Sequence, residues 1–257
     1  MIIDHPSATL TPALKSLWRE AFRDTDAFID AFFETAYSPT RSMAAVEDGE
    51  VCAALYFFDC EYHGSKVAYV YAVTTAESHR GRGICRRLME HTHGHLKALG
   101  YAAAILVPGD KSLFSLYEKM GYRICSHVDK IFVVPDEEDT YPSRVELTQI
   151  DISQYAALRR KYLPKNGIVQ EGECLRLLSE YADFFSFPGG VFAAYGTPRH
   201  LQVVELLGND SVLDAITLTF HSTAGSFLTP GTKEPFAMCI DLAGTLDDEV
   251  YFGLALN

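Results

Sequence analysis

The sequence predicts a mixed α/β (α+β) fold in which helices flank a mostly antiparallel sheet, followed by a second, smaller α/β domain. Three observations predict this class: two amphipathic helical patterns at the start, β-forming segments separated by hairpin signals, and an apolar strand that leads through a glycine- and arginine-rich loop into a helix. A chain of 257 residues, 48% of them hydrophobic, is long enough for one large or two modest domains.

The first elements are two helices, because residues 11–22 and 25–37 carry apolar side chains at helical spacing. Each pattern opens on a threonine, Thr11 or Thr25, which predicts that its hydroxyl caps the first turn. Three β-rich segments follow, and hairpin signals separate them at Asp48-Gly49 and His63-Gly64. We therefore expect a three-stranded antiparallel meander ending near Thr75.

Further helices and strands alternate up to Pro135. A helix ending at Gly100, a short apolar strand, a helix ending at Gly121 and a final strand are expected over residues 83–100, 101–108, 110–121 and 122–135. Residues 135–144, PDEEDTYPSR, combine prolines with acidic residues and indicate an exposed connector. We place a first domain at 1–138, a linker at 139–147 and a second domain at 148–257.

The second domain has a similar but smaller pattern of elements without a sequence repeat. A helix is expected at 152–163, strands at 191–195 and 200–208, a helix at 211–221, and strands at 224–230, 234–242 and 249–257.

Charge and composition restrict the class of partner. Lys and Arg number 22 against 34 Asp and Glu, giving a net charge of −12, which argues against nucleic-acid binding and favours small cationic partners. The N-terminal residues resemble no signal peptide, and no apolar run approaches the roughly 20 residues of a membrane span. We expect a cytoplasmic protein that does not bind membranes, and leave its oligomeric state open.

Cysteines and histidines give no metal signal in the sequence. The six cysteines are widely spaced with no CxxC pair, which predicts reduced and mostly buried thiols. His91, His93 and His95 lie close together, but without a third ligand at a clear spacing we expect a solvated helix face and no metal.

The stretch ESHRGRGICRRLME, residues 77–90, concentrates four arginines and two glycines within eight positions of an acidic chain. A loop before a helix presents unpaired N–H groups and the positive end of the helix dipole, so it favours anions. Gly81 and Gly83 allow the backbone to approach a phosphate, and Arg80, Arg82, Arg86 and Arg87 supply forked donors. The pattern is neither a nucleoside-triphosphate P-loop nor a dinucleotide fingerprint, and it lacks the repeats of an RNA-binding RG segment.

Residues 72–85, AVTTAESHRGRGIC, resemble motif A of the GNAT superfamily of N-acetyltransferases, and SLFSLYEKMGYR about 30 residues later resembles its motif B. Cys85 stands where the family usually has Gly or Ala. The resemblance implies a GNAT fold, acetyl-CoA as co-substrate and transfer of an acetyl group to a primary amine. It also implies cofactor contacts from the end of the fourth-strand equivalent, the loop and the start of the motif B helix: Val73, Thr74, Thr75, Arg80, Gly81, Arg82, Gly83, Ile84, Cys85, Arg86, Ser112 and Leu113.

Tyr117 of motif B is the candidate general acid, since a phenol with a pKa near 10 stays protonated at neutral pH and can donate its proton to the CoA thiolate. The base is open among Asp59, Glu61, Glu77, a water chain and the Asn257 carboxylate. Asn257 enters because the whole chain resembles the enhanced-intracellular-survival type of acetyltransferase, in which a degenerate GNAT-like domain follows the first. The sterol-carrier-like domain of that type is missing here.

Two functions are therefore expected: direct acetyl transfer to a small-molecule or peptide amine, or acetyl-CoA binding without catalysis. The acidic net charge favours a cationic acceptor, but neither its identity nor the length of the acyl group follows from the sequence.

Overall fold

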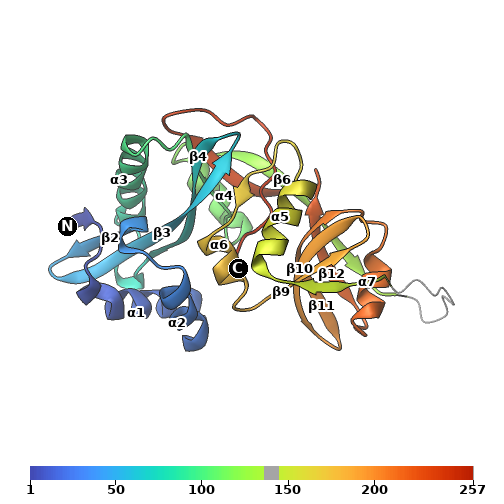
Figure 1. The fold of residues 1–257 in the computed structure, drawn as a ribbon. Coiled ribbons are helices and arrows are strands. Elements are labelled where there is room, and N and C mark those ends of the chain that lie inside the picture. Colours follow the sequence, from blue (N-terminus) through green and yellow to red (C-terminus); the bar gives the residue numbers. More distant parts are fainter. Residues whose placement is uncertain (136–144, 257) are drawn as a thin grey trace. The chain divides into compact units, whose positions relative to one another are not determined.

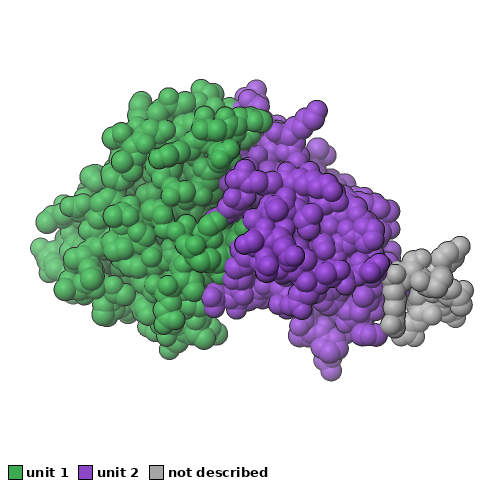
Figure 2. Space-filling view, in the orientation of Figure 1, with its two compact units in different colours: residues 1–123, 172–177, 238–246 green, residues 124–171, 178–237, 247–257 purple. Residues whose placement is uncertain are grey.

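The computed structural model describes residues 1–135 and 145–256, and these form two compact units (Figures 1 and 2). Unit 1 comprises residues 1–123, 172–177 and 238–246, and unit 2 comprises residues 124–171, 178–237 and 247–257. Both are mixed α/β structures, as the sequence predicts.

Unit 1 is a sheet with the strand order β1-β2-β3-β4-β5-β13 and helices on both faces. Every neighbouring pair is antiparallel except β4 and β5, which are parallel. Its elements are β1 (Ile2–Asp4), η1 (Ala8–Leu10), α1 (Thr11–Phe22), α2 (Asp26–Thr35), η2 (Pro39–Arg41), β2 (Ser42–Glu47), β3 (Glu50–Tyr62), β4 (Ser65–Thr75), η3 (Glu77–His79), α3 (Ile84–Ala98), β5 (Ala103–Leu106), α4 (Lys111–Glu118), most of α6 (Glu173–Leu178) and the end of β13 (Glu234–Asp241).

Both faces of the central strand β3 are covered. Helices α1 and α2 lie on one face of β2–β4 and α3 lies on the other, so residues 52–58 are all buried (Figure 1). Trp18 of α1 anchors an aromatic cluster, with ring centroids 4.6 Å from Phe32 and 5.4 Å from Tyr56. This core fixes the strands that lead into the glycine-arginine loop.

The two hairpins are confirmed. Asp48-Gly49 and His63-Gly64 both adopt positive φ at each position, the conformation of type I′ turns. Of the two predicted threonine caps, Thr25 accepts the Phe28 N–H at 3.2 Å, but Thr11 caps nothing. Helix α1 begins one residue earlier than that prediction required, so Thr11 lies inside the helix and Leu10 occupies the cap position.

Unit 2 contains strands in the order β6-β12-β11-β10-β9-β7. Helix α7 packs Leu213 and Ile216 against one face, and Tyr155 and Arg159 of α5 meet Glu205 of β11 from the opposite face. The elements are β6 (Arg123–Val133), β7 (Thr148–Ile150), α5 (Ile152–Tyr162), β8 (Val169–Gln170), β9 (Asp183–Phe187), β10 (Gly190–Thr197), β11 (His200–Gly208), α7 (Leu213–Thr219) and β12 (Gly225–Pro230).

The strand expected at 249–257 is wrong. Of the described residues 249–256, only Tyr251 forms a bridge, with Gly167, and side chains bind the backbone beyond it. Ser126 Oγ accepts the Phe252 N–H at 3.0 Å, and the Gln170 amide bonds both the N–H and the C=O of Leu254 at 3.1 and 2.7 Å. Because these groups are satisfied by side chains, no strand ladder forms over residues 252–256.

The compact units divide the chain differently from the predicted domains. Strand β6 belongs almost entirely to unit 2, and residues 172–177 and 238–246 belong to unit 1. The predicted boundary at 138 and most of the linker 139–147 lie outside the described residues. No helix in the described ranges has the length and apolar character needed to span a membrane.

Candidate active site

Strand β4 separates from β5 before it ends. The parallel β4–β5 ladder runs from Val67↔Ala103 to Tyr69↔Ile105, whereas β4 continues to Thr75. A β-bulge then alters its last residues, because Ala72 and Val73 together lie opposite Leu55 and Ala72 has a φ of 48°. The bulge redirects the backbone of Val73–Thr75 just where a neighbouring strand is lost.

Two hydroxyl groups at this end of β4 have no internal partner. Among the described residues, Thr74 Oγ1 and Thr75 Oγ1 are buried and accept or donate no hydrogen bond. Buried polar groups are normally satisfied in native structures, so unpaired ones indicate a place where a ligand supplies the partner. Both threonines are among the predicted cofactor contacts.

The loop after β4 keeps its backbone accessible. Gly81 and Gly83 have φ values of 75° and 72°, and Gly83 is the N-cap of α3. A Cβ built on either glycine would find nothing within 4 Å, so open space adjoins the loop. Since the first turn of a helix has no intrahelical partners for its N–H groups, Ile84, Cys85 and Arg86 present donors and a positive dipole beside that space.

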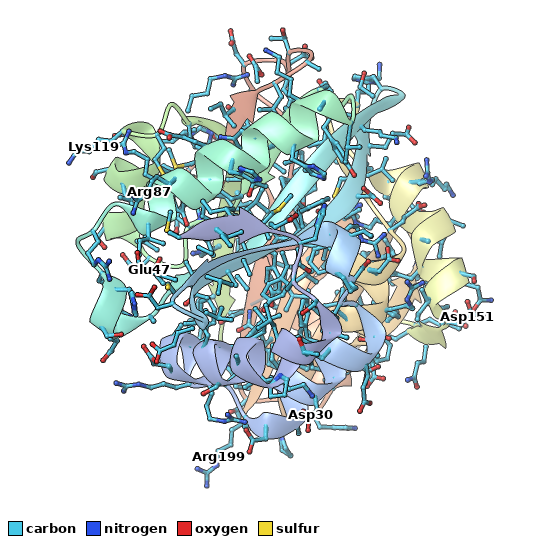
Figure 3. All side chains as sticks on the ribbon, turned by 90° about the vertical axis from the view of Figure 1, so that its left-hand side faces the viewer. Asp30, Glu47, Arg87, Lys119, Asp151 and Arg199 are labelled. Atoms are coloured by element: carbon cyan, nitrogen blue, oxygen red, sulfur yellow. The ribbon has the colours of Figure 1, made fainter. Side chains whose placement is uncertain are left out.

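Arg80 and Arg82 of the loop both have protein partners. Arg80 donates from Nε to the Thr75 carbonyl at 3.3 Å, which ties the loop to the end of β4. Arg82 Nη2 lies 2.5 Å from a carboxylate oxygen of Glu47, and this contact lowers the pKa of Glu47. Figure 3 labels Glu47 together with Arg87 from the first turn of α3. Sequence reasoning missed Glu47, although it directly precedes the Asp48-Gly49 turn.

Tyr117 is buried in α4, with 7% of its surface exposed. Burial raises the pKa of its phenol above the ordinary 10.0, and the proximity of Cys85, at the start of α3, raises it further. Its ring packs edge-on against Tyr122 at 5.7 Å between centroids. The phenol is therefore protonated at neutral pH.

The start of α4 is held by its own cap. Asp110 accepts the Ser112 N–H at 2.7 Å and the Ser112 hydroxyl at 2.5 Å. The Ser112 side chain is thus bonded within the cap, while Leu113 is half-buried next to it. Of these two predicted cofactor neighbours, Ser112 has its hydroxyl engaged with protein.

Of the three histidines of α3 that the sequence predicted to be solvated, His91 is exposed, but His93 and His95 are half-buried. His93 is half-buried with Nε2 at 2.8 Å from the Tyr122 hydroxyl, and burial lowers the pKa of His93 to about 4. The His95 ring packs on His5 at 4.8 Å between centroids. The expectation was wrong for His93 and His95, because their side chains lie toward neighbouring elements of unit 1.

Two candidate bases lie far along the sheet from the loop. Asp59 pairs with Ala68 and Glu61 with Lys66, whereas Thr75 at the site pairs with Ala53. Six residues of β3 separate Asp59 from Ala53, a distance of about 20 Å at the rise of an extended strand. Asp59 is also engaged, accepting from the Tyr101 hydroxyl and lying 3.4 Å from Arg41.

Glu77 lies closer to the site, in η3 directly after β4. Its carboxylate is 3.4 Å from Arg80, and its backbone N–H donates to Glu20 of α1 at 2.6 Å. Glu20 is a second carboxylate that sequence reasoning missed, since nothing in the pattern of α1 sets it apart. The Asn257 carboxylate lies outside the described residues.

This geometry fits one class of protein. Residues 3–125, slightly less than half of the chain, match the family model described as an acetyltransferase (GNAT) domain. No curated protein matches the sequence at a significant level.

Solved structures of GCN5-related N-acetyltransferases share the fold over nearly the whole chain. The one from Anabaena variabilis has a TM-score of 0.74 at 12% identity, covering 93% of this chain and 72% of that one. The one from Kribbella flavida has a TM-score of 0.69 at 15% identity, with coverages of 94% and 71%. A further solved structure, Eis1 from Mycobacterium abscessus, has a TM-score of 0.68 at 12% identity, with coverages of 95% and 74%.

Proposed function

We propose that the protein is an acetyl-CoA-dependent N-acetyltransferase that moves an acetyl group to a primary amine by direct attack in a ternary complex. The observation that carries the proposal is the sequence of features at the end of β4: a bulge, a lost neighbouring strand, and a glycine loop at the N-terminus of α3. When bound, acetyl-CoA supplies an activated thioester.

The loop binds the pyrophosphate in this proposal. The N–H groups of the first turn of α3 lie at the positive end of the helix, and Gly81 and Gly83 leave room for an anion to reach the loop. Arg80, Arg82 and Arg86 add positive charge. At the end of β4 the redirected backbone of Val73–Thr75, together with the unpaired hydroxyls of Thr74 and Thr75, takes the pantetheine arm.

Tyr117 donates the proton to the departing thiolate. A general acid must be protonated when it acts, and burial keeps the Tyr117 phenol protonated. Proton removal from the amine falls to Glu77, to solvent or to the Asn257 carboxylate, because Asp59 and Glu61 lie near the opposite end of their strand.

Direct attack is favoured over an acyl-enzyme route. Cys85 lies in the first turn of α3, directly after the loop, and its burial raises the pKa of the thiol above the ordinary 9.0. A nucleophilic cysteine needs a lowered pKa or an adjacent base, so Cys85 is better suited to packing beneath the loop. We further propose that the acceptor is cationic, since the net charge of −12 attracts amines.

The alternative is a protein that binds acetyl-CoA without turnover. Free thiol release from acetyl-CoA, measured against a panel of polyamines, aminoglycosides and lysine peptides, separates the two. Thiol release that depends on an amine, with a matching gain of one acetyl group in that amine by mass spectrometry, supports the transferase. Saturable acetyl-CoA binding without amine-dependent thiol release contradicts it and supports the alternative.

A further inference from the structure

Three side chains able to bind a metal meet beside the loop, from three separate segments. Glu47 ends β2, His79 ends η3, and Cys52 is the extra residue of a bulge in β3, because Ala45 pairs with Ala53 while Val46 pairs with Val51. A bulge re-aims the side chain of its extra residue. The Ala76 N–H donates to the Cys52 carbonyl at 2.8 Å and so fixes the start of η3 against β3.

The donor atoms of these side chains are close to coordination distance. One carboxylate oxygen of Glu47, Sγ of Cys52 and one ring nitrogen of His79 all lie within 4.8 Å of one another. Ligands around a tetrahedral zinc ion, with bonds of about 2.0–2.3 Å, lie about 3.5 Å apart. The half-buried Glu47 and His79 can close the difference by side-chain rotation, while Cys52 is fixed in the core with 0% exposure.

We propose that Glu47, Cys52 and His79 form a binding site for Zn²⁺. A thiolate, an imidazole and a carboxylate together favour a borderline metal such as zinc over Mg²⁺ or Ca²⁺, which prefer oxygen ligands only. Three protein ligands leave the fourth tetrahedral position to water. Coordination releases the Cys52 thiol proton to solvent, since the thiolate is the ligand.

The contacts around the site support this assignment and identify its rival. Ser78 Oγ lies 2.9 Å from His79 Nδ1 and restricts rotation of the ring. Arg82 Nη2 lies 2.5 Å from Glu47, so it competes with a metal cation for this carboxylate. The positive charge of Arg82 also repels the cation. Arg82 therefore sets the affinity of the site and links it to the glycine-arginine loop.

Cobalt titration of the whole chain tests the proposal, because Co²⁺ replaces Zn²⁺ and reports each bound thiolate through an ultraviolet charge-transfer band. We expect the wild-type protein to give this band at one equivalent and to lose it when Zn²⁺ is added. Cys52→Ser should abolish the band. His79→Ala and Glu47→Gln should weaken Co²⁺ binding by more than the 10- to 100-fold typical of losing an outer-shell partner.

Matched controls separate ligation from folding. Cys60→Ser changes another buried cysteine of β3, and His91→Ala changes an exposed histidine of α3; both should leave the titration unchanged. Arg82→Gln should tighten Co²⁺ binding, because it frees Glu47 and removes a positive charge. If Cys52→Ser fails to fold, zinc X-ray absorption of the wild type must still reveal one sulfur ligand.

No charge-transfer band in the wild type, a band that survives in Cys52→Ser, or weaker Co²⁺ binding in Arg82→Gln would each overturn the site. None of these measurements uses acetyl transfer, so the test is independent of the proposed function.

Discussion

The proposed role of Tyr117 as general acid depends on a single hydroxyl group. Tyr117→Phe removes the proton donor but keeps the ring that packs on Tyr122. General acids contribute about 10²–10⁴-fold, so we expect kcat to fall by about that factor while CoA affinity is retained. Steady-state kinetics combined with CoA titration measure both; an unchanged kcat removes the assignment.

The raised pKa of Tyr117 also predicts the alkaline side of the pH profile. A general acid loses activity as pH rises through its pKa, and burial moves the pKa of this phenol above 10.0. Wild-type kcat should therefore show no falling limb due to Tyr117 below pH 10. A limb near pH 8 that disappears in Tyr117→Phe would contradict the burial argument.

His93 predicts an acid-sensitive fold. Its pKa is about 4 in the folded protein and about 6.5 when unfolded, so between these values the unfolded state binds more protons. The folded state therefore has its full stability with respect to His93 above pH 6.5. As pH falls toward 4, the free energy of unfolding decreases by up to roughly 3 kcal/mol. We expect the free energy of unfolding, measured with urea across this pH range, to depend much less on pH in His93→Gln than in the wild type. His91→Gln, at an exposed position of the same helix, should keep the wild-type dependence.

At the scale of elements, a buried ion pair joins α5 to β11 in unit 2. Arg159 and Glu205 have side chains 2% and 0% exposed, with Nε and Oε2 2.7 Å apart, and the hydroxyls of Tyr155 and Tyr251 also donate to Glu205. Removing one partner leaves a buried charge unpaired, so Arg159→Met should cost about 3–5 kcal/mol of unfolding free energy.

The neighbouring pair Arg160–Glu171 is the matched control for Arg159→Met. Its side chains are 49% and 32% exposed, and surface pairs contribute about 0–1 kcal/mol. Arg160→Met should therefore change the urea midpoint little. Equal effects of the two substitutions would show that burial does not control the energy of this pair.

Elements with strong local signals were predictable, and those defined by distant contacts were not. The hairpin at Asp48-Gly49 and the Thr25 cap follow from residue type alone. The bulges at Ala72 and Cys52 arise from pairing between strands and carry no sequence mark. The same distinction applies to the site. The loop glycines could be identified from the sequence, whereas Glu20 and Glu47 lie near the loop only because the fold brings distant segments together.

At the scale of the whole molecule, each compact unit is built from three separate segments of the chain. Residues 172–177 and 238–246 join unit 1 although they follow strands of unit 2. A sequence read from start to end predicts domains as continuous stretches, which explains why the predicted boundary near 138 differs from this division. The strand predicted at the C-terminal end was wrong for a related reason. The apolar pattern of residues 250–256 fits a strand, but their backbone groups bond to side chains.

The central claim is that the loop at the N-terminus of α3 holds the pyrophosphate of CoA. Its most direct test is calorimetric titration of CoA into the wild type, Gly83→Val and Gly64→Val. Both glycines have positive φ, 72° and 80°, and open space at the Cβ position, so the two substitutions impose similar backbone strain. Only Gly83 lies at the proposed site. The account predicts that Gly83→Val abolishes CoA binding while Gly64→Val retains it; CoA affinity retained in a folded Gly83→Val protein would contradict the account.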